Sequence, residues 1–205
     1  LRRGQVLFTY LHLAPDLAQT QDLLASGATC IAYETVTSPS GGLPLLTPMS
    51  EVAGRMAVQA AAYHLQSSAG GAGLLLGGVP GTPAAKVTII GGGVAGTESA
   101  KMALGLRAIV RVLDTNAARL SYLSDVFGGR LDLVIPNRAR TAAYVAESDV
   151  VIGAVLVAGA LLAPGNSATA AAVESPDISV TNTKAHLDQL QSIAWRWLIP
   201  LALLN

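Results

Sequence analysis

A glycine-rich turn in the middle of the chain constrains the fold more than any other feature. The apolar segment 86–90 runs directly into GGGVAG, which places Gly91, Gly93 and Gly96 in the G-x-G-x-x-G pattern. In that pattern the first glycine permits a tight turn, the second lets the backbone approach a pyrophosphate, and the third lets a helix pack on a strand. We therefore expect a strand, a turn and a helix whose first N–H groups, at Val94 and Ala95, face a phosphate.

The turn belongs to a regular alternation of strands and helices. A glycine pattern alone could serve turn geometry, so this context decides its meaning. The order is typical of an α/β fold, a Rossmann-type doubly wound parallel sheet. We expect strands at 86–90, 109–114, 131–135 and 149–155, and helices at 94–105, 116–127 and 140–146.

An acidic residue ends the second strand of this alternation. Asp114 follows the turn at close to the roughly 20 residues at which a carboxylate accepts hydrogen bonds from the adenosine ribose. It would repel a 2′-phosphate, and Thr115 and Asn116 supply no compensating arginine, so NAD is favoured over NADP. Arg119, one turn into the next helix, either flanks the adenosine or is a solvated helix charge, and both interpretations stay open.

The first third of the chain predicts part of a second α/β domain. Periodicity indicates a strand at 6–11, a helix at 16–26 and a strand at 29–33, a unit that favours parallel pairing. After a loop rich in serine, proline and glycine, a long helix is expected at 49–65, with Thr47 as its N-cap. Residues 67–83 are rich in glycine and form a boundary loop.

Composition excludes several classes of function. Of 205 residues, 51% are hydrophobic and 13% charged, so the chain folds rather than staying disordered. The formal net charge is +0, which gives no field for nucleic acid. The single cysteine, Cys30, allows no intrachain disulfide or zinc cluster, fits a cytoplasmic setting, and is expected to be a small buried residue. The most apolar terminal stretch, 193–204, contains Arg196 and Pro200 and is too short to cross a membrane.

Six stretches of the chain form specific motifs. They are QVLFTYLHLAP (5–15), TPMSEVAGR (47–55), GGVPG (77–81), GGGVAGTESAKMALG (91–105), FGG (127–129) and VIGAVLV (151–157). These stretches resemble the NAD-dependent alanine dehydrogenases of the alanine dehydrogenase and transhydrogenase alpha-subunit family, and the resemblance runs almost without gaps from residue 1 to about 160. It implies reversible oxidative deamination of L-alanine to pyruvate and ammonium, with NAD, by a hexamer.

The resemblance also implies roles for individual residues. His12 matches the catalytic histidine, whose imidazole can exchange a proton near neutral pH, although from the residues alone it would be a strand-end histidine with a structural hydrogen bond. Ser50 matches a cofactor-contacting serine, with helix capping as the alternative. Val155 and Leu156 match a turn that touches the cofactor, although such residues also fill sheet edges.

The chain departs from the family pattern at three places. Pro136 replaces a serine near the adenine, which removes a hydroxyl group. The arginine and lysine that hold the substrate carboxylate lie upstream of Leu1, and beyond about residue 160 the match ends, so the aspartate beside the nicotinamide is not found. These departures leave a second hypothesis open, a non-catalytic NAD(H)-binding remnant.

The resulting organisation has four parts. Residues 1–47 form a partial catalytic domain, 48–66 an interdomain helix, 67–160 the NAD-binding domain, and 161–205 a tail that departs from the family, with a strand expected at 177–180 and a helix at 183–197. On the long helix, Ala57, Ala60 and Ala61 are candidates for a helix contact in the hexamer. Arg55 is expected to pair with Glu51, one turn earlier, rather than with Glu34.

Overall fold

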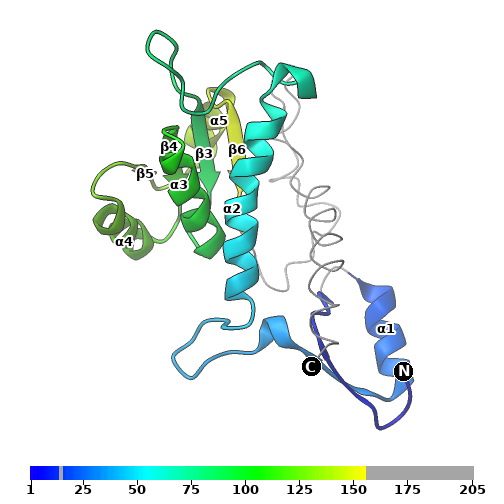
Figure 1. The fold of residues 1–205 in the computed structure, drawn as a ribbon. Coiled ribbons are helices and arrows are strands. Elements are labelled where there is room, and N and C mark those ends of the chain that lie inside the picture. Colours follow the sequence, from blue (N-terminus) through cyan, green and yellow to red (C-terminus); the bar gives the residue numbers. More distant parts are fainter. Residues whose placement is uncertain (14–15, 156–205) are drawn as a thin grey trace. The chain divides into compact units, whose positions relative to one another are not determined.

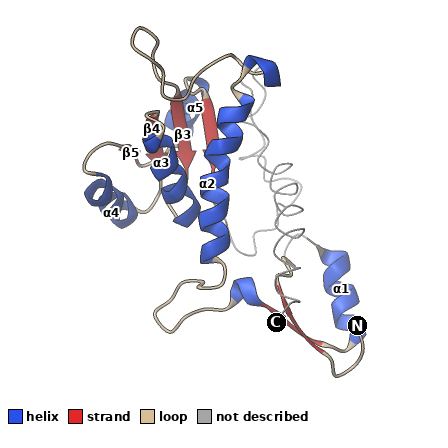
Figure 2. Cartoon of the chain, viewed as in Figure 1, coloured by secondary structure: helices blue, strands red, loops and turns tan. Residues whose placement is uncertain are grey.

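The computed structural model describes residues 1–13 and 16–155, and it divides them into two compact units, Leu1–Val52 and Ala53–Val155. Figures 1 and 2 show the elements of each unit. The elements predicted at 177–180 and 183–197, and Leu156, lie outside the described residues.

The first unit is built on a strand, helix and strand, as the periodicity predicts. Strands β1 (Val6–Thr9) and β2 (Thr29–Ala32) pair in parallel, with Val6 opposite Thr29. Helix α1 (Leu17–Ser26) connects them. A short 3-10 turn, η1 (Tyr33–Thr35), follows β2 directly.

The long helix α2 (Thr47–His64) begins earlier than predicted. The turn before it already supplies a helical acceptor, because the Thr47 N–H donates to the carbonyl of Leu43 at 2.9 Å. The Thr47 hydroxyl donates to the same carbonyl at 3.0 Å. The prediction that Thr47 is an N-cap is therefore wrong, since an N-cap oxygen accepts a hydrogen bond from the helix.

The second unit contains a four-stranded parallel sheet in the order β5-β4-β3-β6. The predicted bounds of β3 and α3 are confirmed, and the other elements differ from their predicted ranges by one or more residues at an end. The strands are β3 (Lys86–Ile90), β4 (Ile109–Leu113), β5 (Asp132–Val134) and β6 (Val150–Gly153), and the helices are α3 (Val94–Gly105), α4 (Ala117–Phe127) and α5 (Arg138–Ala146). A second 3-10 turn, η2 (Ser67–Ala69), lies in the glycine-rich boundary loop.

The chain reverses its direction across the sheet at β3. Helices α3 and α4 carry it from β3 through β4 to β5, and α5 carries it back past both strands to β6. Because parallel crossovers are right-handed, α5 lies on the face opposite α3 and α4. The carboxyl end of β3 is therefore the switch point at which open α/β sheets bind ligands.

The core of this unit joins the sheet to α2 and α3. Val87, Ile89 and Val112 of the sheet are at most 1% exposed, and Val58 and Ala61 of α2 pack into the same cluster. Ala57 packs against this cluster as well. The alanine face predicted as a contact between subunits is thus used, at Ala57 and Ala61, to bind the helix to its own sheet.

Helices α2 and α3 approach each other closely at Gly54. A Cβ atom there would overlap the carbonyl oxygen of Ala95, and the Ser99 hydroxyl donates to the Gly54 carbonyl at 2.9 Å. Arg55, the next residue, donates its Nε to Glu98 Oε2 at 2.7 Å. The predicted pairing of Arg55 with Glu51 is therefore wrong, because α3 brings a buried carboxylate to Arg55 that the sequence of α2 does not reveal.

Candidate nucleotide-binding turn and histidine site

The glycine turn occupies the switch point, and the packing of the chain itself requires two of its glycines. Gly91 has a φ of +101°, and its N–H donates to the Leu113 carbonyl at 2.7 Å. A Cβ atom at Gly91 would lie 2.7 Å from the carbonyl oxygen of Ala154, and one at Gly96 would overlap the carbonyl oxygen of Gly91. These two glycines allow strand, turn and helix to pack together.

Gly93 differs from its neighbours because nothing in the described chain requires a glycine there. Its φ of −62° lies outside the left-handed region that favours glycine, and an added Cβ atom would meet no other atom within 4 Å. It is the N-cap of α3 and makes no side-chain cap hydrogen bond. The first N–H groups of α3, at Val94 and Ala95, therefore have no side-chain cap, which suits an approaching phosphate.

Asp114 stands at the end of β4 and binds the glycine turn. Its Oδ2 accepts the Gly92 N–H at 2.7 Å, and its Oδ1 accepts the Asn116 N–H at 2.8 Å. The carboxylate is half-buried. Each oxygen has further acceptor capacity, so the group can still accept ribose hydroxyls.

Arg119 extends from α4 back to the same turn. Its Nε donates to the Gly92 carbonyl at 2.6 Å, and its Nη2 donates to the Thr97 hydroxyl at 2.6 Å. Thr97 in turn donates to the Gly92 carbonyl at 3.1 Å. The interpretation of Arg119 as a solvated helix charge is therefore wrong. Sequence reasoning missed Gly92 and Thr97, although Thr97 directly follows the glycine pattern.

The remaining predicted cofactor residues lie at several places. Val155 is 62% exposed, and its side chain lies beside Gly91, so that a Cβ atom on the glycine would be 2.9 Å from Val155 Cγ2. Pro136 lies in the loop after β5. Ser50 lies in the first turns of α2, where its N–H donates to the Leu46 carbonyl at 3.1 Å.

His12 lies just beyond β1 in an unusual backbone conformation. Its φ is +47°, in the left-handed region, and its side chain is exposed. The Tyr10 hydroxyl lies 3.2 Å from His12 Nδ1, and the two rings are stacked with centroids 5.7 Å apart. The backbone N–H of His12 donates to Glu34 Oε1 at 2.8 Å. Cys30, on the neighbouring strand, is half-buried rather than buried as predicted.

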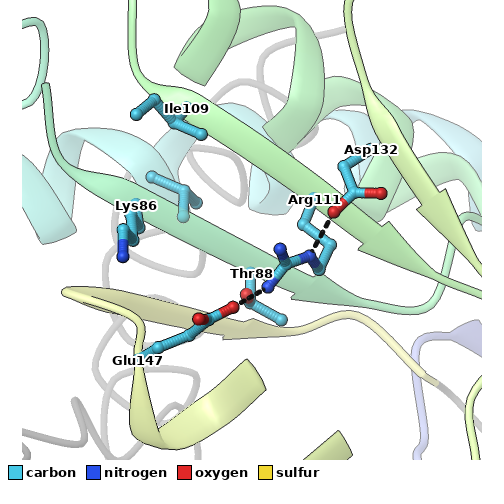
Figure 3. A pocket seen from close by; sticks show the side chains of 7 residues that line it. Lys86, Thr88, Ile109, Arg111, Asp132 and Glu147 are labelled. Carbon is cyan, nitrogen blue, oxygen red and sulfur yellow. Dashed lines mark hydrogen bonds and ion pairs between the residues drawn. The ribbon is translucent and has the colours of Figure 1, made fainter. Parts of the chain in front are cut away.

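A separate pocket lies around Arg111 on the sheet of the second unit (Figure 3). Arg111 donates to Asp132 and Glu147, and its guanidinium lies 3.6 Å from the centroid of the Tyr144 ring. These contacts balance its charge, so the cluster serves to bind strands to α5. The pocket is lined by Lys86, Val87, Thr88, Ile109, Arg111, Asp132 and Glu147.

Two classes of feature are not found in the part of the chain that the structure describes. Residues 1–13 and 16–155 contain no group of three or more His, Cys, Asp or Glu side chains that could hold a metal ion. No helix within these residues is long and apolar enough to span a membrane.

Solved structures show the same fold. An L-alanine dehydrogenase matches with a TM-score of 0.69 and 55% sequence identity, over 77% of this chain and 44% of that one. A transhydrogenase from Sinorhizobium meliloti matches with a TM-score of 0.61 at 22% identity, over 77% and 47%. The second match shows the fold alone.

Sequence comparison gives a consistent result. An alanine dehydrogenase from Halomonas elongata is 59% identical over 160 residues, which are 78% of this chain and 43% of that protein. Alanine dehydrogenase 2 from Staphylococcus aureus is 57% identical over 159 residues, again 78% and 43%. The chain thus spans less than half the length of these relatives.

The profile described as "Alanine dehydrogenase/PNT, N-terminal domain" matches residues 1–53, and that described as "Alanine dehydrogenase/PNT, C-terminal domain" matches residues 57–165. With more than half of its residues matched by the C-terminal profile, the chain belongs to the alanine dehydrogenase/PNT family.

Proposed function

We propose that this chain carries the NAD site and the acid–base histidine of an L-alanine dehydrogenase. The single observation that carries the nucleotide site is Gly93, where φ is negative and the surrounding space admits a side chain and yet the residue is glycine. A bound pyrophosphate explains that choice, because it approaches the backbone where a Cβ atom would lie.

The residues around the turn fit a dinucleotide. Gly93 and the N–H groups of Val94 and Ala95 bind the pyrophosphate, and Gly91 and Gly96 shape the turn. Asp114 accepts hydrogen bonds from the adenosine ribose, which selects NAD over NADP. Arg119 fixes the Gly92 carbonyl and flanks the adenosine. Two further contacts complete the proposed site, namely Ser50 and the turn at Val155 and Leu156.

His12 supplies proton transfer. Its exposed imidazole takes a proton from the attacking water or from the carbinolamine hydroxyl, and returns it in the reverse reaction. NAD, when bound, provides the acceptor for the hydride from the alanine Cα. L-alanine, NAD⁺ and water then give pyruvate, ammonium, NADH and a proton. Residues 1–47 contribute to the substrate domain, 48–66 link the domains and 67–160 bind the cofactor.

A second candidate is a chain that binds NAD(H) without turnover. The observation behind it is coverage, since residues 1–205, tested by themselves, span 43% of the length of the curated relatives. By family resemblance, the groups that hold the substrate carboxylate, and the aspartate beside the nicotinamide, fall outside the matched part. Assembly as a hexamer and a cytoplasmic setting belong to the first proposal.

A fluorescence titration with NADH tests the cofactor site. The unmodified chain should bind saturably, and Gly93→Ala should weaken binding about tenfold or more, which corresponds to roughly 1.4 kcal/mol or more of lost binding energy. Its melting temperature should stay close to that of the unmodified chain, because the added Cβ atom meets nothing and only the preference for glycine over alanine at the N-cap is lost. Equal binding by both proteins would contradict the proposed pyrophosphate contact.

Turnover separates the two candidates. Pyruvate and ammonium are added to the NADH-loaded chain, and absorbance at the NADH band is followed. Consumption that is lost in His12→Ala supports the dehydrogenase, whereas saturable binding without consumption supports the binding-only chain. A His64→Ala variant, altered at the end of α2, serves as the matched control.

A further inference from the structure

We propose that Glu34 is the positioning residue for His12: its carboxylate holds the backbone at residues 11 and 12 in the bend that directs the imidazole. The inference rests on the proposed role of His12 as the acid–base group. It concerns contacts within the first unit alone.

The carboxylate of Glu34 is buried and receives two consecutive backbone N–H groups. The residue is 8% exposed and lies in η1, directly after β2. Its Oε1 accepts the N–H of Leu11 at 3.2 Å and that of His12 at 2.8 Å. Its Oε2 lies 3.3 Å from the Leu11 nitrogen. One oxygen thus accepts two consecutive N–H groups just beyond the end of β1.

Consecutive N–H groups converge on one acceptor only where the extended backbone is broken. In a strand, successive N–H groups point to opposite sides, so the shared acceptor shows that the backbone at Leu11, which lies between the two N–H groups, departs from the extended conformation. His12, the next residue, has a φ of +47°, a rotation about the bond from its nitrogen to its Cα atom. Left-handed φ is sterically unfavourable for a residue with a Cβ atom, so a specific interaction has to stabilise it. The charge-assisted hydrogen bond from the His12 N–H to Glu34 is that interaction, because it fixes the peptide plane from which this rotation starts.

The same bend determines where the imidazole lies. It brings His12 Nδ1 to 3.2 Å from the Tyr10 hydroxyl, with the two rings inclined by only 13°. Burial raises the pKa of Tyr10, and the charges of Glu34 and then Tyr33 raise it further, so this phenol stays protonated at neutral pH. With Nδ1 beside Tyr10, the opposite ring nitrogen, Nε2, is left for substrate.

A packing role alone does not account for Glu34. A buried carboxylate is costly to desolvate, and an apolar side chain would fill the same space at lower cost. Gln19 already ties this segment to α1, since its Nε2 donates to the Leu11 carbonyl at 2.6 Å. What Glu34 adds is an acceptor for two neighbouring N–H groups.

The test uses nuclear magnetic resonance on the full chain and three variants. Glu34→Ala removes the acceptor, and Glu34→Gln keeps an oxygen that can accept both N–H groups but removes the charge. Asp22→Asn makes the same acid-to-amide change on the exposed side of α1 in the same unit. The readouts are the intraresidue HN–Hα nuclear Overhauser effect of His12, which is strong at positive φ, and the contact between the Tyr10 and His12 rings.

Both signals should be present in the unmodified chain, in Asp22→Asn and in Glu34→Gln, and lost in Glu34→Ala. The cross-strand contact between Leu7 and Cys30 monitors the fold of the unit. Persistence of the His12 signals in a folded Glu34→Ala variant would overturn the proposal. So would their loss in Glu34→Gln, because that variant retains the acceptor oxygen.

Hydrogen exchange of the His12 amide tests the proposal even if Glu34→Ala fails to fold, because it compares the unmodified chain with Glu34→Gln. Exchange of the His12 amide proton should speed up roughly tenfold in Glu34→Gln, because a neutral acceptor holds it more weakly than a carboxylate. The Asp22→Asn variant should show the rate of the unmodified chain. An unchanged rate in Glu34→Gln would overturn the proposal. None of these readouts uses NADH, so a chain that failed to bind NADH would contradict the proposed function and leave the positioning of His12 intact.

Discussion

The carboxylate of Asp114 and the backbone N–H of Gly92 are joined by a hydrogen bond of 2.7 Å, which fixes the turn after β3 to the end of β4. The residue proposed to bind ribose therefore also shapes the turn proposed to bind pyrophosphate. Its two functions are coupled through one side chain.

Replacement of Asp114 by alanine should consequently impair stability and binding together. We expect the free energy of unfolding to fall by about 1–3 kcal/mol, since the Gly92 and Asn116 N–H groups lose a charged acceptor. NADH affinity should fall at least tenfold, a loss of about 1.4 kcal/mol. Urea denaturation and fluorescence titration measure the two effects. Asp125→Ala, on the exposed side of α4, should change neither, and a binding defect at full stability would show that Asp114 does not support the turn.

Gly96→Ala should destabilise the second unit, in contrast to Gly93→Ala. The added Cβ atom would overlap the Gly91 carbonyl oxygen, and a rigid turn relieves such an overlap only by backbone movement. A loss of about 1–3 kcal/mol is expected from overpacking of this kind. Circular dichroism melts of both variants provide the comparison. Equal melting temperatures for the two alanine variants would show that the turn yields more easily than its packing indicates.

Acid should weaken the contact between α2 and α3 through Glu98. A hydrogen bond from Lys101, and after it one from Arg55, lowers the pKa of Glu98 below its ordinary value of 4.5, although burial opposes the shift. A lowered pKa in the folded state adds stability that is present above pH 4.5 and is lost as the pH falls through the folded value.

At pH 7, Glu98→Gln should therefore lower the free energy of unfolding by about 1–3 kcal/mol, so the variant unfolds at a lower urea concentration. The difference from the unmodified chain should shrink below pH 4.5. Urea midpoints over a pH series measure this. Glu51→Gln, on α2 one turn before Arg55, is the matched control. A Glu98→Gln deficit that did not depend on pH would mean that shape, rather than charge, sets the contribution of Glu98.

Pro136→Ser should strengthen NADH binding by up to about tenfold, within the net value of one hydrogen bond. The change should not disturb α5, because the Asn137 side chain caps that helix by accepting the Arg140 N–H at 2.8 Å. Calorimetric titration of the variant, with Pro80→Ser in the boundary loop as control, gives the answer. Unaltered affinity would place the adenine away from this loop.

The bounds of an element could be predicted where residues close together in sequence determine them. The bounds of β3 and α3 follow from an apolar run that meets three consecutive glycines, so both ends of the turn are set locally. The start of α2 did not follow, because Leu43 supplies an acceptor from an irregular loop that has no periodic signal.

Side-chain hydrogen bonds and ion pairs between different elements could not be predicted from the sequence. The sequence predicts that Arg119 lies near the site, but its bond to Gly92 depends on how α4 packs against the turn. The spacing on α2 predicts that Arg55 pairs with Glu51, whereas the packing of α3 presents Glu98 instead. Such pairings depend on tertiary geometry, which spacing along one helix does not encode.

The residues of the glycine turn are contiguous in sequence, but the residues that pack against the turn come from a distant part of the chain. Strand β6 joins β3 from Val150 to Gly153, and the next two residues, Ala154 and Val155, form the surface against Gly91. Pairing between distant segments forms slowly, since a long loop must close first. During synthesis the glycine turn therefore emerges well before the strand that completes it. If the chain binds a nucleotide as proposed, binding therefore begins late in folding, once β6 has paired with β3.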